Sequence, residues 1–250
     1  MEKIPKVIHY IWIGNNEKPE KVKECIKSWK KYMPDYEIKE WNESNFNIKE
    51  CQYAIQAYRD KKWAFVSDYM RFKILYDQGG IYLDTDVELL KRIPEEILNN
   101  NSFTGVEFIG KINPGLIFGC RKENNIAKYM VEKYKKLMFD KNNLITVNEI
   151  ITEYLKPFGY KENNTLQVVK GLTIYPDEFF CGYDQDVKEI KITKNTITVH
   201  HYLGTWCKKG IKHKIQYYIK KIIGIENYRK MLYLKRRVGK IGKKERNNNL

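Results

Sequence analysis

Hydrophobic and polar residues alternate along the chain in short blocks, and these blocks predict strands and helices in turn. An apolar run at 6–14, "KVIHYIWIG", predicts a first strand, and the segment 19–33 has apolar residues at helical spacing, which predicts a helix. The segment "YEIKEWN" at 36–42 alternates between polar and apolar residues, as a half-exposed strand does. The chain is therefore expected to begin with a strand, a helix and a second strand.

The remaining blocks continue this alternation. They predict helices at 49–60, 62–78, 126–138 and 146–155, and strands near 79–89, 103–108, 115–120, 165–176 and 195–206. Strands and helices that alternate in this way indicate an α/β fold, with a mixed sheet flanked by helices. In such folds ligands bind at the carboxyl ends of the strands.

Two carboxylates interrupt one of the predicted strands, "GGIYLDTDVEL" at 79–89. If this segment is extended, Asp84 and Asp86 point to the same side, together with Tyr82 and Glu88. Charged side chains are costly to bury without a partner, and a cation bound to a diphosphate would provide one. The alternative is a strand at the edge of the sheet whose acidic face is solvated. A D-x-D pair alone does not decide between the two.

The helix predicted at 62–78 carries an ion pair on its apolar side. Asp68 falls on the apolar stripe, and Arg71 lies three residues further on, within reach of the Asp68 carboxylate. Buried ion pairs are weak sources of stability, so this pair is either a structural bridge or part of a functional site. Gly79 and Gly80 are expected to end the helix directly before the D-x-D strand.

Length and composition indicate the number of domains and the cellular compartment. The chain has 250 residues, of which 42% are hydrophobic, and this is enough for one globular domain with a substantial core. Its five cysteines are widely spaced and form no C-x-x-C pair, which predicts reduced structural thiols in a cytoplasmic protein. The apolar run at the start is too short for a signal peptide, and no segment approaches the length of a membrane span.

Most of the net charge of +15 lies in one segment, 208–246, which contains fifteen Lys and Arg against two acidic residues. Apolar residues recur there at helical spacing. We therefore predict a domain at 1–207 followed by a basic amphipathic helical tail at 208–250, whose last residues are disordered. Such a helix suits peripheral contact with an anionic membrane, here the inner face of the cytoplasmic membrane. The alternative is a helix packed on the domain with a solvated lysine face.

The segment "AFVSDYMRFKILYDQGGIYLDTDVEL" at 64–89 resembles the sugar-nucleotide-binding region of D-x-D glycosyltransferases. It is similar to glycosyltransferase family 32, which includes capsular-polysaccharide and mannosyltransferase-like enzymes, and more distantly to the glucosyltransferase domain of large clostridial toxins. The pattern S-D-x-x-R followed by G-G-I-Y-x-D-x-D carries the resemblance, which extends from "IPKVIHYIWIG" to "VHHYLGTW". It implies a GT-A type, Rossmann-like catalytic domain that binds a nucleotide sugar.

The resemblance also implies roles for individual residues. Trp12 matches the tryptophan that stacks on the nucleobase, and Asp68 and Arg71 match the residues that hold the sugar and ribose hydroxyls. Asp84 matches the first D-x-D carboxylate, which accepts hydrogen bonds from donor hydroxyls. The implied donor-binding set is Ile11, Trp12, Asp68, Arg71, Tyr82, Asp84, Asn113 and Trp206. The implied catalytic set is Asp68, Arg71, Asp84 and Asp86.

A divalent metal is the cofactor that this resemblance implies, with Asp86 as the carboxylate that ligates it. A hard cation neutralises the charge that gathers on a departing nucleoside diphosphate. A further ligand would be His200 or His201, and the alignment of "HYLGTW" on the family pattern favours His201; Asp84 completes the candidate set. An imidazole ligand favours Mn²⁺, although Mg²⁺ is also compatible.

The sequence thus predicts a metal-dependent, retaining hexosyltransferase. Its donor would be a nucleotide sugar, most simply a UDP-sugar, and its acceptor a glycan or lipid-linked oligosaccharide in surface-polysaccharide synthesis. One alternative is a toxin-like glycosyltransferase that modifies a protein. Another is a basic nucleic-acid-binding protein, but the basic charge is confined to the tail, and the acidic cluster would repel phosphate unless a metal were bound.

Overall fold

The computed structural model describes residues 3–184, 187, 189–204, 223–224, 227–228 and 231. Its contacts divide the chain into two units, one of residues 1–183 with 191–206 and the other of residues 184–190 with 207–250. The predicted basic tail lies almost entirely outside the described residues, and so do Trp206 and Cys207. The sheet and helices discussed below belong to the first unit.

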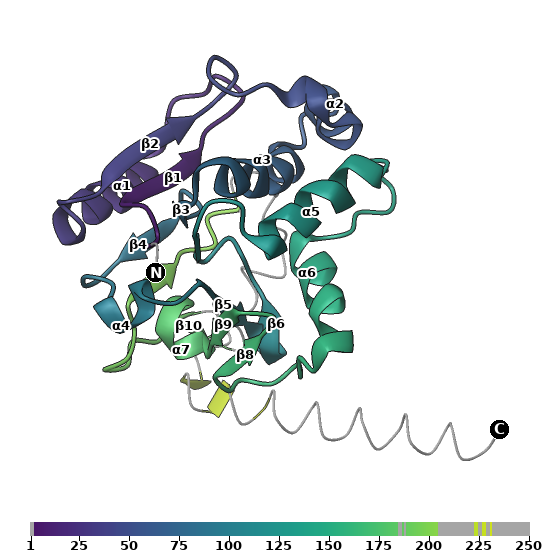
Figure 1. Cartoon of the computed structure of the whole chain (residues 1–250). Coiled ribbons are helices and arrows are strands. Elements are labelled where there is room, and N and C mark those ends of the chain that lie inside the picture. Colours follow the sequence, from purple (N-terminus) through teal and green to yellow (C-terminus); the bar gives the residue numbers. More distant parts are fainter. Residues whose placement is uncertain are drawn as a thin grey trace. The chain divides into compact units, whose positions relative to one another are not determined.

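Among the described residues, eight strands form one sheet in the order β2-β1-β3-β7-β5-β9-β8, with β6 paired to β5. Figure 1 shows β1 between β2 and β3 in this sheet. These strands are β1 Val7–Ile11, β2 Glu37–Trp41, β3 Gly80–Tyr82, β5 Ser102–Glu107, β6 Lys111–Ile112, β7 Phe118–Cys120, β8 Gln167–Val169 and β9 Leu172–Tyr175. β1 runs parallel to β2 and β3, and β5 runs parallel to β9, whereas β7 is antiparallel to both β3 and β5. The predicted mixed sheet is therefore confirmed.

The other strands pair outside this sheet. β4, Val87–Leu89, is antiparallel to β12, Thr198–His200, and β10, Tyr183–Asp184, pairs with β11, Glu189–Ile190. The helices are α1 Glu20–Tyr32, α2 Gln52–Arg59, α3 Trp63–Gln78, α4 Glu95–Leu98, α5 Asn125–Lys136, α6 Val147–Leu155 and α7 Asp177–Phe180. Single 3-10 turns lie at Ile48–Glu50, Phe108–Gly110 and Lys156–Phe158. Within the described residues, no helix is long and apolar enough to cross a bilayer.

Helices cover both faces of the main sheet, because side chains alternate between the faces along each strand. Ile8 and Ile81 point into a core shared with α1 and α7, whereas Tyr82 and Phe118 point into a core shared with α2, α3, α5 and α6. The four described cysteines, Cys25, Cys51, Cys120 and Cys181, are buried free thiols. Their burial and the absence of a disulfide among them agree with the predicted reduced, structural thiols.

The junction between α3 and β3 depends on two glycines with positive φ, Gly79 at 66° and Gly80 at 99°. A β-carbon on Gly80 would lie 2.8 Å from both His9 Nε2 and the Val7 carbonyl oxygen, so no larger residue fits there. His9 fixes the junction from β1, since its Nε2 lies 2.9 Å from the Gly79 carbonyl oxygen and its Nδ1 accepts from Trp41 Nε1 at 3.1 Å. As predicted, the glycines end the helix directly before β3.

We expect His9 to make the stability of the protein depend on pH. Burial lowers the pKa of His9 to about 4, from 6.5 when it is unfolded, so the unfolded chain binds the proton first as the pH falls. Stability is therefore lost as the pH falls from 6.5 through 4, by about 3 kcal/mol in total. Urea unfolding followed by tryptophan fluorescence at pH 7 and pH 5 measures about 2 kcal/mol of this loss. His9→Gln, which does not titrate, should show a smaller loss; equal losses in the two proteins would contradict the expectation.

The predicted strand at 79–89 is not continuous, and this expectation was wrong. The chain leaves the main sheet after Tyr82 and turns, with the Val87 N–H donating to the Asp84 carbonyl at 3.0 Å. β4 then pairs with β12, in the register Val87 to His200. Alternating positions of one strand would place both carboxylates on the same face. In the turn, Asp84 and Asp86 instead meet different hydrogen-bond partners, the Tyr82 hydroxyl and the Leu203 N–H.

Candidate active site

The site lies at the carboxyl ends of two parallel neighbours, β1 and β3. His9 is in register with Tyr82, and the Leu83 N–H donates to the His9 carbonyl at 3.1 Å. Trp12, directly after β1, and Asp84, two residues after the end of β3, therefore emerge at the same edge of the sheet. The Trp12 indole Nε1 donates to the Asn16 carbonyl at 2.7 Å, and its ring is half-buried. Ile11 is buried and supports this edge from within the core.

Helix α3 brings a buried cation to this edge. Arg71 Nη2 lies 2.8 Å from Asp68 Oδ1 and 3.4 Å from Asp84 Oδ1, so one guanidinium serves two carboxylates. Arg71 and Asp68 are only 3% and 6% exposed. The guanidinium also lies over the Tyr82 ring, 4.7 Å from its centroid. The sequence predicted the contact within the helix, and the contact with Asp84 depends on the α3–β3 junction.

Burial sets the protonation of this cluster. It raises the pKa of Asp68 above its ordinary value, against the opposing charge of Arg71. Burial also works against the cation of Arg71, but Asp84, Tyr82 and Asp68 together raise the Arg71 pKa. The pKa of Tyr82 is raised well above its ordinary value by burial, so its hydroxyl stays protonated and can donate. The result is a fixed positive charge between two carboxylates.

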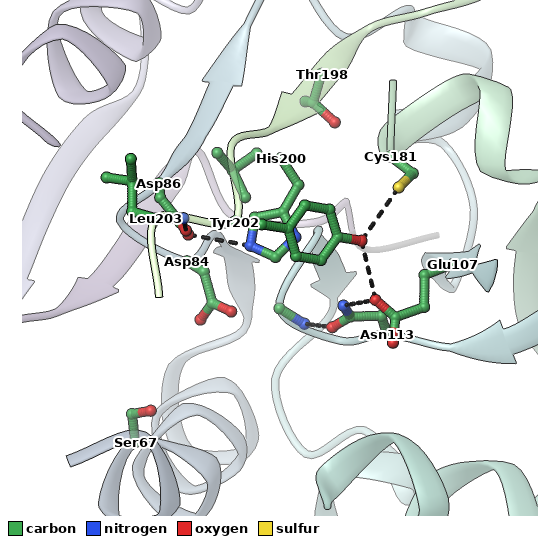
Figure 2. Close-up of polar contacts among 12 residues, drawn as sticks. Ser67, Asp84, Asp86, Glu107, Asn113, Cys181, Thr198, His200, Tyr202 and Leu203 are labelled. Carbon is green, nitrogen blue, oxygen red and sulfur yellow. Dashed lines mark hydrogen bonds and ion pairs between the residues drawn. The ribbon is translucent and has the colours of Figure 1, made fainter. Parts of the chain in front are cut away.

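Asp84 is held by the loop before β7. Its N–H donates to the Gly115 carbonyl at 2.9 Å, and its Oδ1 accepts from the Tyr82 hydroxyl at 2.8 Å. The Gly115 N–H in turn donates to Asn113 Oδ1 at 2.8 Å. Figure 2 shows Asp84 on the side of Asp86 that faces Ser67 of α3. Asn113 is buried.

Gly115→Ala is expected to lower activity, because a β-carbon on this residue would lie 2.0 Å from Asp84 Oδ2. The carboxylate or the loop must move, and a misplacement of about 1 Å is worth about 100-fold in rate. We expect donor turnover to fall about 10- to 100-fold while the melting temperature changes little. Gly159→Ala is the matched control, since a β-carbon there meets nothing within 4 Å. Normal turnover by Gly115→Ala would show that the position of Asp84 is unimportant.

Asp86 occupies the other side of the turn. Its Oδ2 accepts from the Leu203 N–H at 2.9 Å, and its Oδ1 lies 3.1 Å from His200 Nε2 (Figure 2). Burial would raise the pKa of Asp86, but the charge of His200 and these hydrogen bonds outweigh it and lower the pKa. Asp86 is therefore an ionised carboxylate that the segment after β12 holds in place.

The two adjacent histidines face different carboxylates. His201 Nε2 lies 2.7 Å from Glu88 Oε2, which also accepts from Lys21 at 2.9 Å. His200, by contrast, faces Asp86, and its Nδ1 is buried without a hydrogen-bond partner among the described residues. The alignment favoured His201 as a ligand, but the structure places His200 beside the D-x-D carboxylate. Register decides this, because β12 pairs His200 opposite Val87.

The geometry accommodates a divalent cation only in part. Among the described residues, no cluster of three or more His, Cys, Asp or Glu could hold a metal ion. Asp86 and His200 can supply two ligands, because their facing atoms lie 3.1 Å apart and adjacent ligands around Mg²⁺ or Mn²⁺ are separated by about 3 Å. Such cations are commonly held by one or two protein groups and completed by substrate phosphates and water.

Glu107 and Tyr202 join the site without having been predicted. Glu107, at the end of β5, accepts hydrogen bonds from Asn113 Nδ2 at 2.9 Å, Asn148 Nδ2 at 2.6 Å and the Tyr202 hydroxyl at 3.0 Å. The Tyr202 ring packs on His200 with centroids 3.9 Å apart. A carboxylate at the carboxyl end of a strand was the available signal for Glu107. Trp206, implied by the resemblance, lies outside the described residues.

Comparison with known proteins matches the segment that contains Asp68, Arg71 and the two D-x-D carboxylates of this site. Residues 19–104 match the family described as "Glycosyltransferase sugar-binding region containing DXD motif". The chain is 28% identical over 159 residues to "Subversion of eukaryotic traffic protein A" of Legionella pneumophila, covering 52% of this chain and 24% of that protein. It is 38% identical over 88 residues to "Inositol phosphoceramide mannosyltransferase 3" of Schizosaccharomyces pombe, covering 34% and 24%. The chain thus spans about a quarter of the length of these relatives.

Solved structures of similar fold include PaToxG glycosyltransferase, with a TM-score of 0.48 and 23% identity over 62% of this chain and 70% of that one. Another is the galactosyltransferase LgtC in complex with donor and acceptor sugar analogs, with a TM-score of 0.46 and 13% identity over 90% of this chain and 95% of that one. These likenesses are too distant to indicate an activity. The resemblance to the D-x-D sugar-binding region is nevertheless confirmed over residues 19–104.

Proposed function

We propose that this chain, which carries the sugar-binding region of D-x-D glycosyltransferases, is a GT-A type enzyme that transfers a hexose from a nucleotide sugar to an acceptor hydroxyl. The observation that carries the proposal is the split of the D-x-D turn. Asp84 joins the buried Asp68–Arg71 pair, whereas Asp86 joins His200. The two carboxylates therefore meet different surroundings, which suit the two chemically different halves of a nucleotide sugar.

The sugar half of the donor suits the Asp84 side of the turn. Sugar hydroxyls are both donors and acceptors, and here carboxylates can accept from them while a guanidinium donates. Asp68, Arg71 and Asp84 form such a mixed set at the carboxyl end of β3. Trp12 emerges at the same edge with a half-buried ring, which favours it as the platform for the nucleobase, and Ile11, Tyr82 and Asn113 are buried around this site.

The diphosphate half suits the Asp86 side. Asp86 and His200 would hold a divalent cation, and His200 rather than His201 is our candidate ligand because His201 is paired with Glu88. When bound, that cation would neutralise the negative charge of the diphosphate as it leaves. An imidazole ligand favours Mn²⁺ over Mg²⁺. Asp84, which lies between Arg71 and Gly115, is the third candidate ligand of the cation.

The proposed reaction retains the anomeric configuration of the donor sugar, as the resemblance implies. The acceptor oxygen forms a bond to the anomeric carbon on the face from which the diphosphate leaves. The bond between that carbon and the phosphate oxygen breaks with its electron pair going to the phosphate, and the acceptor proton passes to a phosphate oxygen. Arg71, held between Asp68 and Asp84, orients the sugar on which this exchange takes place. This front-face route requires no nucleophilic side chain.

A donor-hydrolysis screen tests the proposal. UDP- and GDP-sugars are incubated with the protein with and without Mn²⁺, and the released nucleotide is measured. We expect turnover of a UDP-hexose that depends on the metal and is lost in Arg71→Lys, whose ammonium cannot bridge Asp68 and Asp84 as the guanidinium does. Absence of binding and turnover with every donor would contradict the proposed function.

The acceptor has two candidate classes, each supported by one relative. A glycan or lipid-linked saccharide is our first choice, since one relative is named as an inositol phosphoceramide mannosyltransferase. A protein acceptor is the second, since another relative is a Legionella protein named for subversion of eukaryotic traffic, matched over 159 residues. Transfer of radiolabelled sugar to a lipid extract or to a protein extract separates the two. Membrane contact through the segment 208–250 remains a prediction, because that segment lies almost entirely outside the described residues.

A further inference from the structure

We propose that Glu107 is a positioning residue that sets the distance between the two halves of the site, the Asp84 side and the Asp86 side. This inference rests on the proposed function. Glu107 ends β5, and its carboxylate accepts hydrogen bonds from the loop before β7, from α6 and from the segment after β12. Two of these contacts lead to the D-x-D turn by separate routes, which we call the Asn113 arm and the Tyr202 arm.

The Asn113 arm reaches Asp84. Glu107 Oε2 accepts from Asn113 Nδ2 at 2.9 Å, which leaves Asn113 Oδ1 to accept from the Gly115 N–H at 2.8 Å. The Gly115 carbonyl then accepts from the Asp84 N–H at 2.9 Å. Because Asn113 uses its amide nitrogen and its oxygen in opposite directions, its side chain cannot flip without losing both contacts. Glu107 thereby fixes the loop against which Asp84 rests.

The Tyr202 arm reaches Asp86. The Tyr202 hydroxyl lies 3.0 Å from Glu107 Oε2 and 3.3 Å from Cys181 Sγ, and burial raises the Tyr202 pKa, so the hydroxyl keeps its proton and donates. The Tyr202 ring packs on the imidazole of His200, which contacts Asp86 at 3.1 Å (Figure 2). Tyr202 has a positive φ of 47°, a conformation that a bulky residue adopts only when its surroundings enforce it. The hydroxyl contact with Glu107 is part of that enforcement.

The third contact, with Asn148, makes it possible to test whether Glu107 acts as a hydrogen-bond acceptor or through its negative charge. Glu107 Oε1 accepts from Asn148 Nδ2 at 2.6 Å, and Asn148 comes from α6. An amide that rotates by half a turn presents its oxygen where its nitrogen was. A glutamine at 107 could therefore place its carbonyl oxygen toward Asn113 and Tyr202 and its NH₂ toward the rotated Asn148 amide. A leucine would leave all three donors without an acceptor. The two substitutions separate positioning from nucleophilic chemistry.

The test compares Glu107→Leu with Glu107→Gln. We expect Glu107→Leu to lower kcat for UDP-sugar hydrolysis about 10- to 100-fold, because both halves of the site lose their support. Glu107→Gln should rescue most of this loss. Loss of kcat in both variants alike would overturn positioning in favour of a nucleophilic or charge-based role. Glu178→Leu is the matched control, since that carboxylate accepts from Asn195 Nδ2 at 3.0 Å and from the Thr193 hydroxyl at 3.1 Å in another part of the fold.

A double-mutant cycle tests the Tyr202 arm. Tyr202→Phe keeps the ring and removes the hydroxyl, and we expect it to lower kcat about tenfold in the wild-type background. In the Glu107→Leu background, Tyr202→Phe should have little further effect, because the same contact is already lost. Full additivity of the two losses would overturn the Tyr202 arm.

A spectroscopic measurement separates this inference from the proposed function. In nuclear magnetic resonance spectra without ligand, Glu107→Leu should shift both the Gly115 amide signal and the His200 imidazole signal, and Tyr202→Phe should shift the His200 signal without the Gly115 signal. Glu178→Leu should shift neither. Unshifted signals in a folded Glu107→Leu protein would overturn the inference even if the wild type is active. Shifted signals in a protein that turns over no donor would instead contradict the proposed function.

Discussion

Replacing Asp86 with asparagine is expected to lower donor-sugar turnover by about 100- to 1,000-fold. The asparagine has nearly the same shape, its oxygen can still accept from the Leu203 N–H, and its NH₂ then faces His200 Nε2, which accepts when the imidazole carries its proton on Nδ1. The fold should therefore persist, and what is lost is the negative charge that would hold a cation against the diphosphate. The measurement is the rate of UDP-sugar hydrolysis as a function of Mn²⁺ concentration, with the melting temperature as the check on folding.

Glu88→Gln provides the matched control for this expectation. Glu88 lies two residues after Asp86 and is likewise paired with a histidine, His201, but it also pairs with Lys21 on α1. Its neutralisation changes the charge of the same segment without touching Asp86 or His200. We expect turnover within about threefold of the wild type. Equal losses in Glu88→Gln and Asp86→Asn would mean that the charge of the segment, and not the Asp86 position, supports activity.

The second large effect is expected at Asp68. Asp68→Ala leaves Arg71 buried with a distant partner, since Asp84 Oδ1 lies 3.4 Å from Arg71 Nη2 whereas Asp68 Oδ1 lies 2.8 Å away. Removal of one partner of a buried ion pair costs about 3–5 kcal/mol. We expect a loss of this size in the free energy of unfolding in urea, together with loss of donor turnover, because Asp68 belongs to the proposed sugar-binding set.

A double substitution distinguishes the structural and functional roles of this pair. When both charges are replaced, as in Asp68→Leu with Arg71→Leu, no charge is left unpaired on α3 and apolar packing takes its place. Asp84 loses its contact with Arg71 but is partly exposed and keeps the hydrogen bond from the Tyr82 hydroxyl. The double variant should therefore recover most of the stability lost in Asp68→Ala and remain inactive. If it recovered both stability and turnover, the Asp68–Arg71 pair would be a structural bridge only, which is the alternative that the sequence left open.

Local patterns were sufficient to predict the α3–β3 region. The apolar stripe of residues 62–78 predicted α3, and the pair Gly79–Gly80 predicted its end, because both signals are contained in consecutive residues. The contact between Asp68 and Arg71 followed from helical spacing alone. The alternation of strands and helices predicted the mixed sheet for the same reason.

Contacts between distant segments could not be predicted in this way. The choice between His200 and His201 depends on the register of β12 against β4, which pairs residues more than a hundred positions apart. The turn at Asp84–Asp86 depends on Gly115 and Leu203, which supply partners from two other loops. Glu107 was missed because nothing in "FTGVEF" reveals that three side chains converge on its carboxylate.

The pairing of β4 with β12 means that the sugar-binding region 19–104 is not a module that can be moved by itself. β3 lies between β1 and β7, both outside that region, and β4 has its partner strand at Thr198–His200. A fragment limited to residues 19–104 would expose unpaired strand edges, which favour aggregation. It would also separate Asp86 from His200. Exchange of this region between proteins would therefore require the flanking strands to be exchanged with it.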